Sequence, residues 1–583
     1  MKLFNPIPYT IIFLMINVSL ANAQNSNIRL NQIGFYPNAQ KFAVWVGDKQ
    51  DSFFILTENK KDTVFSGKFS LQRINNISQK TTQIADFSNY KKTGKYIVAI
   101  PAIGVSYPFE ISPNVHREVA KGALKGFYYQ RVSIDLPEKY AEKWHREMGH
   151  PDDKILIHAS AASIQRPEGT LIASPRGWYD AGDYNKYIVN SGITTATLLS
   201  LYEDYPDFFK AFEVNIPESG NKIPDLLDEV LWNLRWMLTM QDPNDGGVYH
   251  KLTNPSFDKM VMPKNATKPR YVIQKNTIAT LDFAAVMAQA SRIFKTYKKE
   301  LPSLADSCLN ASKRAWNWAK ENPTIVYRQN EMNKAFDPDI VTGGYEDRSD
   351  SDEWIWAATE LYVTTKGDNY YKAVNLYPET AMSLPSWNQV QMLAYYSLIR
   401  NEKNLTDLGK KDLSNLKKKL IAFGDQLLLG VDSQAFNTVM GKSGKDYMWG
   451  SSSHAANQGI ALLQVYRINL DEKYLAAALG NLDYLLGRNA TGYSFLTGFG
   501  SKQVMFPHHR PSEADGIVEP VPGLLSGGPN PGQQDKCEGY PTKIADESFL
   551  DATCSYSTNE IAINWNAPMV YLAAALEALQ KKF

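Results

Sequence analysis

The sequence is poor in cysteine, in excess charge and in long apolar runs. Only 3 of its 583 residues are Cys, too few for a disulfide scaffold. Lys and Arg number 62 against 61 Asp and Glu, so the chain lacks the strongly basic face that nucleic-acid binding requires. Beyond the first two dozen residues there is no apolar run of the ~20 residues that a transmembrane helix needs. We therefore expect neither a nucleic-acid partner nor a membrane span.

Aromatic residues, in contrast, are abundant. The chain has 32 Tyr, 25 Phe and 12 Trp, and 44% of it is hydrophobic. This is ample material for a packed core, and the length indicates more than one domain. Aromatic side chains in such excess either thicken a large core or line a groove in which flat ligands, such as sugars, stack.

The first 23 residues have the features of an export signal. Lys2 precedes an apolar stretch, residues 9–20, which ends in Ala21-Asn22-Ala23. A basic start, a short apolar middle and an A-x-A end are typical of a secretory signal peptide, cleaved here before Gln24. The alternative is an uncleaved anchor. We expect an exported protein, periplasmic or extracellular, with a mature chain that starts at Gln24.

Residues 24–112 are expected to form a small β-sandwich. Lys41–Val46, Asp51–Leu56 and Gly94–Ile100 are short, rich in β-branched and aromatic residues, and bounded by turn residues. Several such strands within fewer than ninety residues are typical of a two-sheet sandwich.

Residues 113–583 change to helical periodicity. In the segment 225–238, Leu227, Val230, Leu234 and Met237 form one apolar stripe. Similar stripes occur at 276–297, 352–363, 387–399, 413–428, 455–467, 474–486 and 560–579. A mainly α toroid is expected; a helical solenoid is the alternative, and the lack of a fixed-period repeat counts against it. The long loops 164–183 and 498–551 are expected to be functional.

The first polar segment, Gly177–Tyr184, holds two acidic residues three apart. Asp180 and Asp183 flank Gly182 and can point into one small volume, where a carboxylate pair can hold and deprotonate a water molecule. The alternative is an Asx turn, in which Asp bonds the following backbone amides. The neighbouring rings of Trp178 and Tyr184 favour the functional interpretation.

Two further segments carry candidate groups. His508, His509 and Arg510 lie between prolines, where they can donate hydrogen bonds to sugar hydroxyls; loop histidines bonded to the backbone are the alternative, and zinc ligation is disfavoured. In the segment 549–567, Glu560 is expected to open the last helix, either as a first-turn acid that complements the helix dipole or as a proton donor.

Taken together, these segments resemble glycoside hydrolase family 9, the inverting cellulases. The matching blocks are Ser174–Tyr187, Glu218–Glu229, Gly246–His250, Trp449–Ser453, Leu486–Asn489, Phe506–Ser512 and Asn559–Pro568. The start of the chain, Arg29–Phe35, is similar to the immunoglobulin-like domain that precedes many of these catalytic domains. The resemblance implies an (α/α)6 barrel and hydrolysis of β-1,4-glucan with inversion.

The resemblance also implies roles for individual residues. Asp183 becomes the general base, Asp180 helps to hold the attacking water, and Glu560 becomes the general acid. Inversion needs these carboxyl groups ~6.5–9.5 Å apart, with room for water. The remaining candidates position the sugar, support the acid or stack on glucose faces: His508, His509, Arg510, Asp551, Trp449, Trp565, Trp178 and Tyr184.

No cofactor is expected to be needed for the chemistry. The zinc cluster of some relatives is not evident, so no zinc is predicted. Relatives often bind calcium at loops comparable to the acidic stretch 342–353, where Asp347, Asp350 and Asp352 offer oxygen ligands; a solvated helix start is the alternative. Cys537 and Cys554 are either bonded or buried free thiols.

The expected function is an endo-β-1,4-glucanase. Its candidate substrates are cellulose, mixed-linkage glucan, glucomannan and xyloglucan, and a monomer is expected. One alternative is an exo-acting glucosidase or glucosaminidase of the same family. The other is a non-catalytic glycan-binding protein, against which the acids Asp183 and Glu560 argue.

Overall fold

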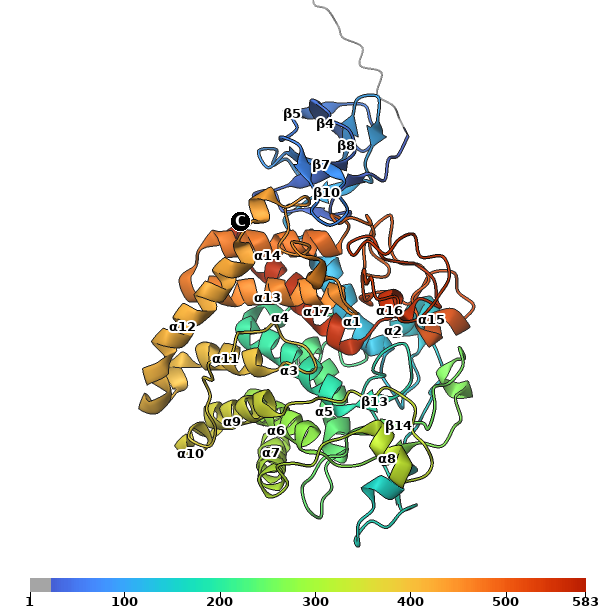
Figure 1. Ribbon diagram of the computed structural model, residues 1–583, viewed down its shortest axis with the longest axis vertical. Coiled ribbons are helices and arrows are strands. Elements are labelled where there is room, and N and C mark those ends of the chain that lie inside the picture. Colours follow the sequence, from blue (N-terminus) through green and yellow to red (C-terminus); the bar gives the residue numbers. More distant parts are fainter. Residues whose placement is uncertain (1–22) are drawn as a thin grey trace, which may run out of the picture.

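The computed structural model describes residues 23–583 (Figure 1). All but the last residue of the predicted signal peptide lie outside this range. A small β domain sits at one end of a larger helical domain. No helix in the described part of the chain is long and apolar enough to cross a membrane.

The β domain is a sandwich of two sheets. One sheet has the order β1-β3-β7-β6; the other has the order β2-β10-β8-β4-β5, with β9 added beside β8. Alternating residues such as Phe53 and Ile55 point into the shared apolar core together with Val98. The three strands expected from the sequence are present, each within one residue of its predicted bounds. The strands are β1 (Ile28–Arg29), β2 (Gly34–Phe35), β3 (Phe42–Val46), β4 (Ser52–Thr57), β5 (Thr63–Lys68), β6 (Arg73–Ile74), β7 (Thr81–Asp86), β8 (Gly94–Ile100), β9 (Gly104–Val105) and β10 (Phe109–Ile111).

The helical domain is an (α/α)6 barrel in which outer and inner helices alternate along the chain. The inner ring, within the described residues, consists of α3 (Ile188–Asp204), α6 (Thr277–Phe294), α9 (Ser351–Thr365), α11 (Gln391–Arg400), α13 (Ser451–Asn469) and α17 (Ile563–Ala578). The main outer helices are α1 (Arg117–Tyr129), α5 (Asp225–Thr239), α7 (Leu304–Glu321), α12 (Asp407–Leu428) and α14 (Glu472–Leu485), with the short α10 (Asp368–Tyr371) before α11. Helix α17 packs on both α3 and α13, which closes the ring and makes the solenoid alternative wrong.

Burial distinguishes the two rings. Inner helix α6 is buried on every face, with Arg292 as its one half-buried residue, because it has neighbours on all sides. Outer helix α7 buries only a stripe that includes Cys308, Ala315 and Ala319 and leaves its charged residues in solvent. The sequence stripes therefore predicted helices correctly, but not the ring to which each belongs.

The two ends of the inner ring differ in chemistry. At the C-terminal ends, Arg292, Arg400 and Arg467 complement the negative ends of the helix dipoles. Arg400 pairs with Asp204 at 2.8 Å in a buried network that closes this end of the barrel. The N-terminal ends instead carry the long loops and a small sheet in the order β12-β11-β15-β14-β13, and the candidate site lies here. These strands are β11 (Ile155–Ile157), β12 (Leu171–Ile172), β13 (Lys186–Tyr187), β14 (Lys251–Thr253) and β15 (Tyr271–Val272).

The β domain is fixed to the barrel through buried contacts. The Asn31 amide donates to Asp483 at 2.8 Å, and the Asn75 amide donates to Asp546 at 2.6 Å. Phe436 of the helical domain packs in one apolar cluster with residues of β3 and β7.

Candidate active site

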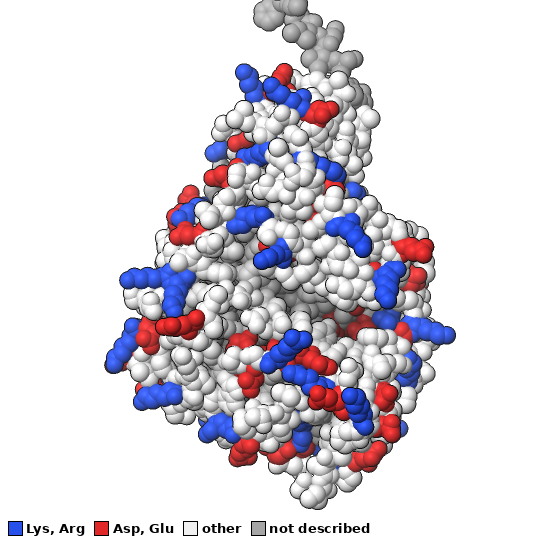
Figure 2. Space-filling model, viewed as in Figure 1, with Lys and Arg blue, Asp and Glu red and all other residues white. Residues whose placement is uncertain are grey.

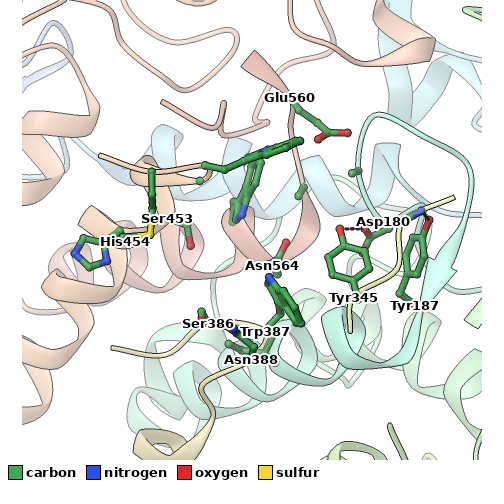
Figure 3. A pocket seen from close by; sticks show the side chains of 18 of the residues that line it. Asp180, Tyr187, Tyr345, Ser386, Trp387, Asn388, Ser453, His454, Glu560 and Asn564 are labelled. Carbon is green, nitrogen blue, oxygen red and sulfur yellow. Dashed lines mark hydrogen bonds between the residues drawn. The ribbon is translucent and has the colours of Figure 1, made fainter. Parts of the chain in front are cut away.

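A cavity of about 920 Å³ opens at the N-terminal ends of the inner helices. Figure 2 shows it as a hollow in the middle of the molecular face. Acidic residues occupy one part of its lining, and aromatic side chains supply much of the rest (Figure 3). The cavity brings together segments that lie far apart in the sequence: 180–187, 343–345, 383–388, 448–457, 508–510 and 556–565.

The loop that carries the two aspartates depends on close backbone packing. A Cβ at Gly182 would lie 2.0 Å from the carbonyl oxygen of His508, so only glycine fits there. The Arg510 side chain donates to the Gly182 carbonyl oxygen at 2.7 Å. Two of the three candidate segments are therefore held together by close backbone packing and by the Arg510 side chain. This brings Asp180 and Asp183 to the segment that carries Arg510.

Asp180 is buried and has three hydrogen-bond contacts from side chains. The Asn190 amide donates to both carboxyl oxygens at 2.9 and 3.1 Å, and the Tyr345 hydroxyl donates to Oδ2 at 2.9 Å. Burial and, next, the neighbouring Asp183 raise the pKa of Asp180 to about 8, although these hydrogen bonds act in the opposite direction. Such a group can share a proton or orient a water molecule.

Asp183 lines the same cavity. Its Oδ2 accepts a short hydrogen bond from the Asn185 amide and another from the Tyr187 hydroxyl at 3.3 Å. Both donors are neutral, and both are fixed by the strand β13 region that follows the loop.

Glu560 does not open the last helix, contrary to the expectation from the sequence. It follows the short helix α16 (Tyr556–Asn559) in an extended conformation, bridged to His508, and α17 begins only at Ile563. Residues 560–562 pair with neighbouring loops instead of entering the helix, which removes Glu560 from the first turn. Its carboxyl group points into the cavity (Figure 3).

The surroundings of Glu560 favour a protonated carboxyl group. Burial raises its pKa well above the usual range, and the charges of Asp183 and Asp180 raise it further. Arg510 and the Gly182 amide oppose the rise without cancelling it. An acid with a raised pKa faces two other carboxyl groups across one cavity, which is the arrangement that general acid–base chemistry requires.

The histidine-rich segment has one side inside the cavity and one side beneath it. His508 and Arg510 line the cavity, and the His508 Nδ1 bonds the Thr553 carbonyl oxygen at 2.6 Å. His509 is buried away from the cavity and bonds the Gln130 amide oxygen at 3.0 Å. Since Gln130 donates to the Ala181 carbonyl oxygen, His509 supports the aspartate loop from beneath and does not line the cavity.

Asp551 also lies behind the cavity wall. Its carboxyl group accepts from the backbone N–H groups of Met505 and Phe506, both at 2.9 Å, and from the Asn559 amide at 3.1 Å. It therefore holds the loop before His508 against the residue that precedes Glu560.

The four aromatic candidates divide evenly. Trp449 and Trp565 line the cavity, and the Trp449 side chain is 41% exposed. Trp178 is fully buried against Phe127, and Tyr184 is buried with its hydroxyl donating to the Val261 carbonyl oxygen. These last two rings are core residues beneath the loop and do not line the cavity.

Sequence reasoning missed Tyr345 and Trp387. Both line the cavity, and their rings pack 5.4 Å apart and nearly perpendicular. Tyr345 follows Gly343-Gly344 just before α9, so a glycine pair in front of a helix was an available signal.

The three aspartates predicted to bind calcium do not converge. Asp347 accepts from the backbone N–H of Arg348, Asp350 from the Trp354 indole, and Asp352 from the backbone N–H of Val390. Within the described chain, no three His, Cys, Asp or Glu side chains form a group that could hold a metal ion. The residues do not fit the predicted three-aspartate site, and calcium binding stays a prediction.

A disulfide joins Cys537 to Cys554, with the Cα atoms 5.6 Å apart. Cys308 is a free, buried thiol in α7. The bond ties the long 498–551 loop to the segment that leads to Glu560.

Comparison with known proteins agrees with this geometry. A model of glycosyl hydrolase family 9 matches residues 116–573, and a model of the cellulase N-terminal Ig-like domain matches residues 23–105. A xyloglucan-specific endo-β-1,4-glucanase of Bacteroides ovatus is 44% identical over 556 residues, which cover 95% of this chain and 94% of that protein. Endoglucanase D of Acetivibrio thermocellus is 33% identical over 94% of this chain and 83% of its own length.

Solved structures show the same architecture. A Bacteroides ovatus family 9 structure superimposes with a TM-score of 0.91 at 42% identity and covers 96% of this chain and 100% of its own. An endoglucanase of Alicyclobacillus acidocaldarius has a TM-score of 0.83 at 28% identity and covers 95% of this chain and 100% of its own. The chain therefore belongs to glycoside hydrolase family 9, with an N-terminal Ig-like domain, and is an inverting glycoside hydrolase of the endo-β-1,4-glucanase type.

Proposed function

We propose that this enzyme cleaves internal β-1,4 bonds in the glucan backbone of xyloglucan. The observation that carries the proposal is the cavity itself: its lining combines the acids Asp180, Asp183 and Glu560 with the rings of Trp387, Trp449 and Trp565. Aromatic walls stack on glucose faces, and an open cavity leaves room for a backbone that carries side branches. The relative from Bacteroides ovatus, described as xyloglucan-specific, supports this choice of substrate.

In the proposed mechanism, Asp183 is the general base and Glu560 is the general acid. Glu560 protonates the glycosidic oxygen, while Asp183 removes a proton from a water molecule that attacks the opposite face of the sugar. Asp180 helps to hold that water. Arg510 and His508 lie beside the acids and are proposed to donate hydrogen bonds to sugar hydroxyls, while Asp551 positions the loop that carries them.

A polysaccharide panel read by product size over time tests the substrate. We expect xyloglucan to be cut fastest and to give large fragments first, because an open cavity admits the middle of a chain. Single sugars from the outset would instead establish an exo-acting enzyme. This second outcome is tested because a cellodextrinase of Butyrivibrio fibrisolvens is 30% identical over 94% of this chain. Faster cleavage of cellulose or mixed-linkage glucan would overturn the xyloglucan assignment.

We also propose that the protein is exported, after cleavage before Gln24. The basic and apolar start of the sequence and its A-x-A end support this. N-terminal sequencing of the protein recovered from the periplasm or medium tests it, and a mature chain that retains Met1 would contradict it.

A further inference from the structure

Lys251 in β14 is a buried cation without a paired carboxylate. Its side chain is fully buried, and no acidic group in the described chain lies within ion-pair distance of its Nζ. The ammonium instead donates to Gln329 Oε1 at 2.7 Å, Thr342 Oγ1 at 3.2 Å and the Gly343 carbonyl oxygen at 2.6 Å. Burying a charge is costly unless its interactions compensate.

The segment 342–345 that Lys251 holds contacts Asp180 directly and Asp183 through Tyr187. The Gly343 N–H donates to the Tyr187 hydroxyl at 3.1 Å, and that hydroxyl donates to Asp183 at 3.3 Å. Two residues later, the Tyr345 hydroxyl donates to Asp180 at 2.9 Å. The segment 342–345 therefore stands between Lys251 and the two carboxyl groups of the site.

The backbone of this segment is in a conformation that needs support. Tyr345 has a φ of 47°, in the left-handed region that a bulky side chain rarely adopts. Such a conformation persists only where surrounding contacts impose it. The Lys251 contact with the Gly343 carbonyl oxygen, two residues before Tyr345, is one of these contacts.

The tyrosine and histidine side chains packed around Lys251 contribute little charge. The rings of Tyr187 and Tyr327 lie 5.5 and 5.6 Å from its Nζ, and burial raises the pKa of both phenols. Burial lowers the pKa of the adjacent His250 to about 3, which keeps this imidazole neutral. The acidic groups that face Lys251 are Asp183 and Glu346.

We propose that Lys251 is a positioning residue for hydrolysis: it fixes the segment 342–345 that aligns Asp180 and Asp183, and it places a positive charge behind Asp183. The proposal rests on the roles given above to these two aspartates. Burial lowers the pKa of Lys251 to about 7, while Asp183 and Glu346 raise it, so the charge depends on its acidic neighbours.

Two variants of Lys251 separate the hydrogen bonds from the charge. Lys251→Met removes both, and we expect kcat to fall ~10²-fold with little change in KM, the loss typical of a misplaced catalytic group. Lys251→Gln keeps an amide donor without charge, so part of kcat should return. In both variants the acid limb of the pH–rate profile should move to higher pH, because a positive charge favours the charged form of a nearby carboxyl group.

Lys186 provides the matched control. It is also a fully buried lysine near the site, but it pairs with Asp152 at 2.7 Å. Lys186→Met should lower the melting temperature without moving the acid limb. An unmoved acid limb in Lys251→Gln, or the same shift in Lys186→Met, would overturn the proposal. If Lys251→Met does not fold, the acid limb measured for Lys251→Gln alone decides whether the proposal holds.

The proposed base is tested separately on whichever glucan the panel identifies. Asp183→Asn should lower kcat about 10²–10⁴-fold at every pH. Activity retained by Asp183→Asn would refute the assignment of the base, whereas normal kinetics in both Lys251 variants would refute only the role of the lysine.

Discussion

Among single residues, the proposed roles of Glu560 as general acid and Asp183 as general base can be distinguished by experiment. Glu560→Gln and Asp183→Asn each remove one proton-transfer group, which typically contributes about 10²–10⁴-fold, so we expect both to lower kcat on polysaccharide by that order. An aryl cellobioside with an acidic phenol needs little protonation of its leaving group. Glu560→Gln should therefore regain much of its activity on this substrate, and Asp183→Asn should not. Equal recovery of both variants in steady-state assays would contradict the roles.

The pKa of Glu560 predicts the alkaline limit of activity. A general acid works only while protonated, and burial together with Asp183 and Asp180 raises its pKa well above the usual range. Activity should therefore persist to a higher pH than a carboxyl group of ordinary pKa would allow, and be lost as the pH rises through the raised pKa of Glu560. Arg510 opposes the rise, so Arg510→Met should lower kcat yet move the alkaline limb to higher pH. Arg510→Lys keeps the charge and should leave the limb in place. Profiles of kcat against pH measure the position of the alkaline limb in each variant. A shift of this limb to lower pH in Arg510→Met would contradict the proposed effect of Arg510 on Glu560.

Residue identity predicted the acids better than the rings. Asp180, Asp183 and Glu560 were expected from several matching blocks in register, and all three line the cavity. Trp178 and Trp449 both adjoin a glycine in the sequence, yet one is fully buried and the other 41% exposed. That difference depends on which distant helix covers each ring, and a local pattern does not contain this information.

At the level of elements, the inner helices are held together at their C-terminal ends by buried charges. Burial alone would raise the pKa of Asp204, but Arg400 and Arg467 outweigh it and lower the pKa to about 2. This contribution to stability is complete above the usual pKa of an aspartate, about 3.9, and is lost as the pH falls towards 2.

Arg400→Met tests this network. It leaves Asp204 with less compensation, and breaking a buried pair costs about 3–5 kcal/mol of unfolding free energy. Urea denaturation at neutral pH should show the loss, and the difference from the unchanged protein should shrink towards pH 2. The exposed Arg314, whose guanidinium bonds the Pro243 carbonyl oxygen, is the control: Arg314→Met should cost less than about 1 kcal/mol. Equal effects of the two variants would refute the network's contribution.

Helices were predictable because their apolar periodicity is local, and the toroid was expected as well, whereas the entry to the last helix was predicted wrongly. The segment from Glu560 to Ala562 continues the apolar pattern of α17 but pairs with His508, Ser526 and Ala181 instead. Pairing across such sequence distances outweighs helix propensity, which is worth less than about 1 kcal/mol per residue.

For the whole molecule, the contact between the two domains reaches the candidate site. Asn75 of the β domain donates to Asp546, which lies in the long loop that leads on to Asp551. Burial raises the pKa of Asp546 to about 6, and the Asn75 hydrogen bond acts against this rise. The β domain thus supports one end of the loop that frames His508 and Glu560.

This coupling predicts that both domains unfold together. Calorimetry should show one transition, because the interface buries polar pairs that neither domain satisfies alone. Asn75→Ala leaves Asp546 without this partner, so we expect the single transition to lose about 1–3 kcal/mol while remaining single. Asn76 is the exposed neighbour, and Asn76→Ala should leave the transition unchanged. If two transitions appear, or if Asn75→Ala destabilises only one of them, the β domain is an independent unit that does not support the active-site loop.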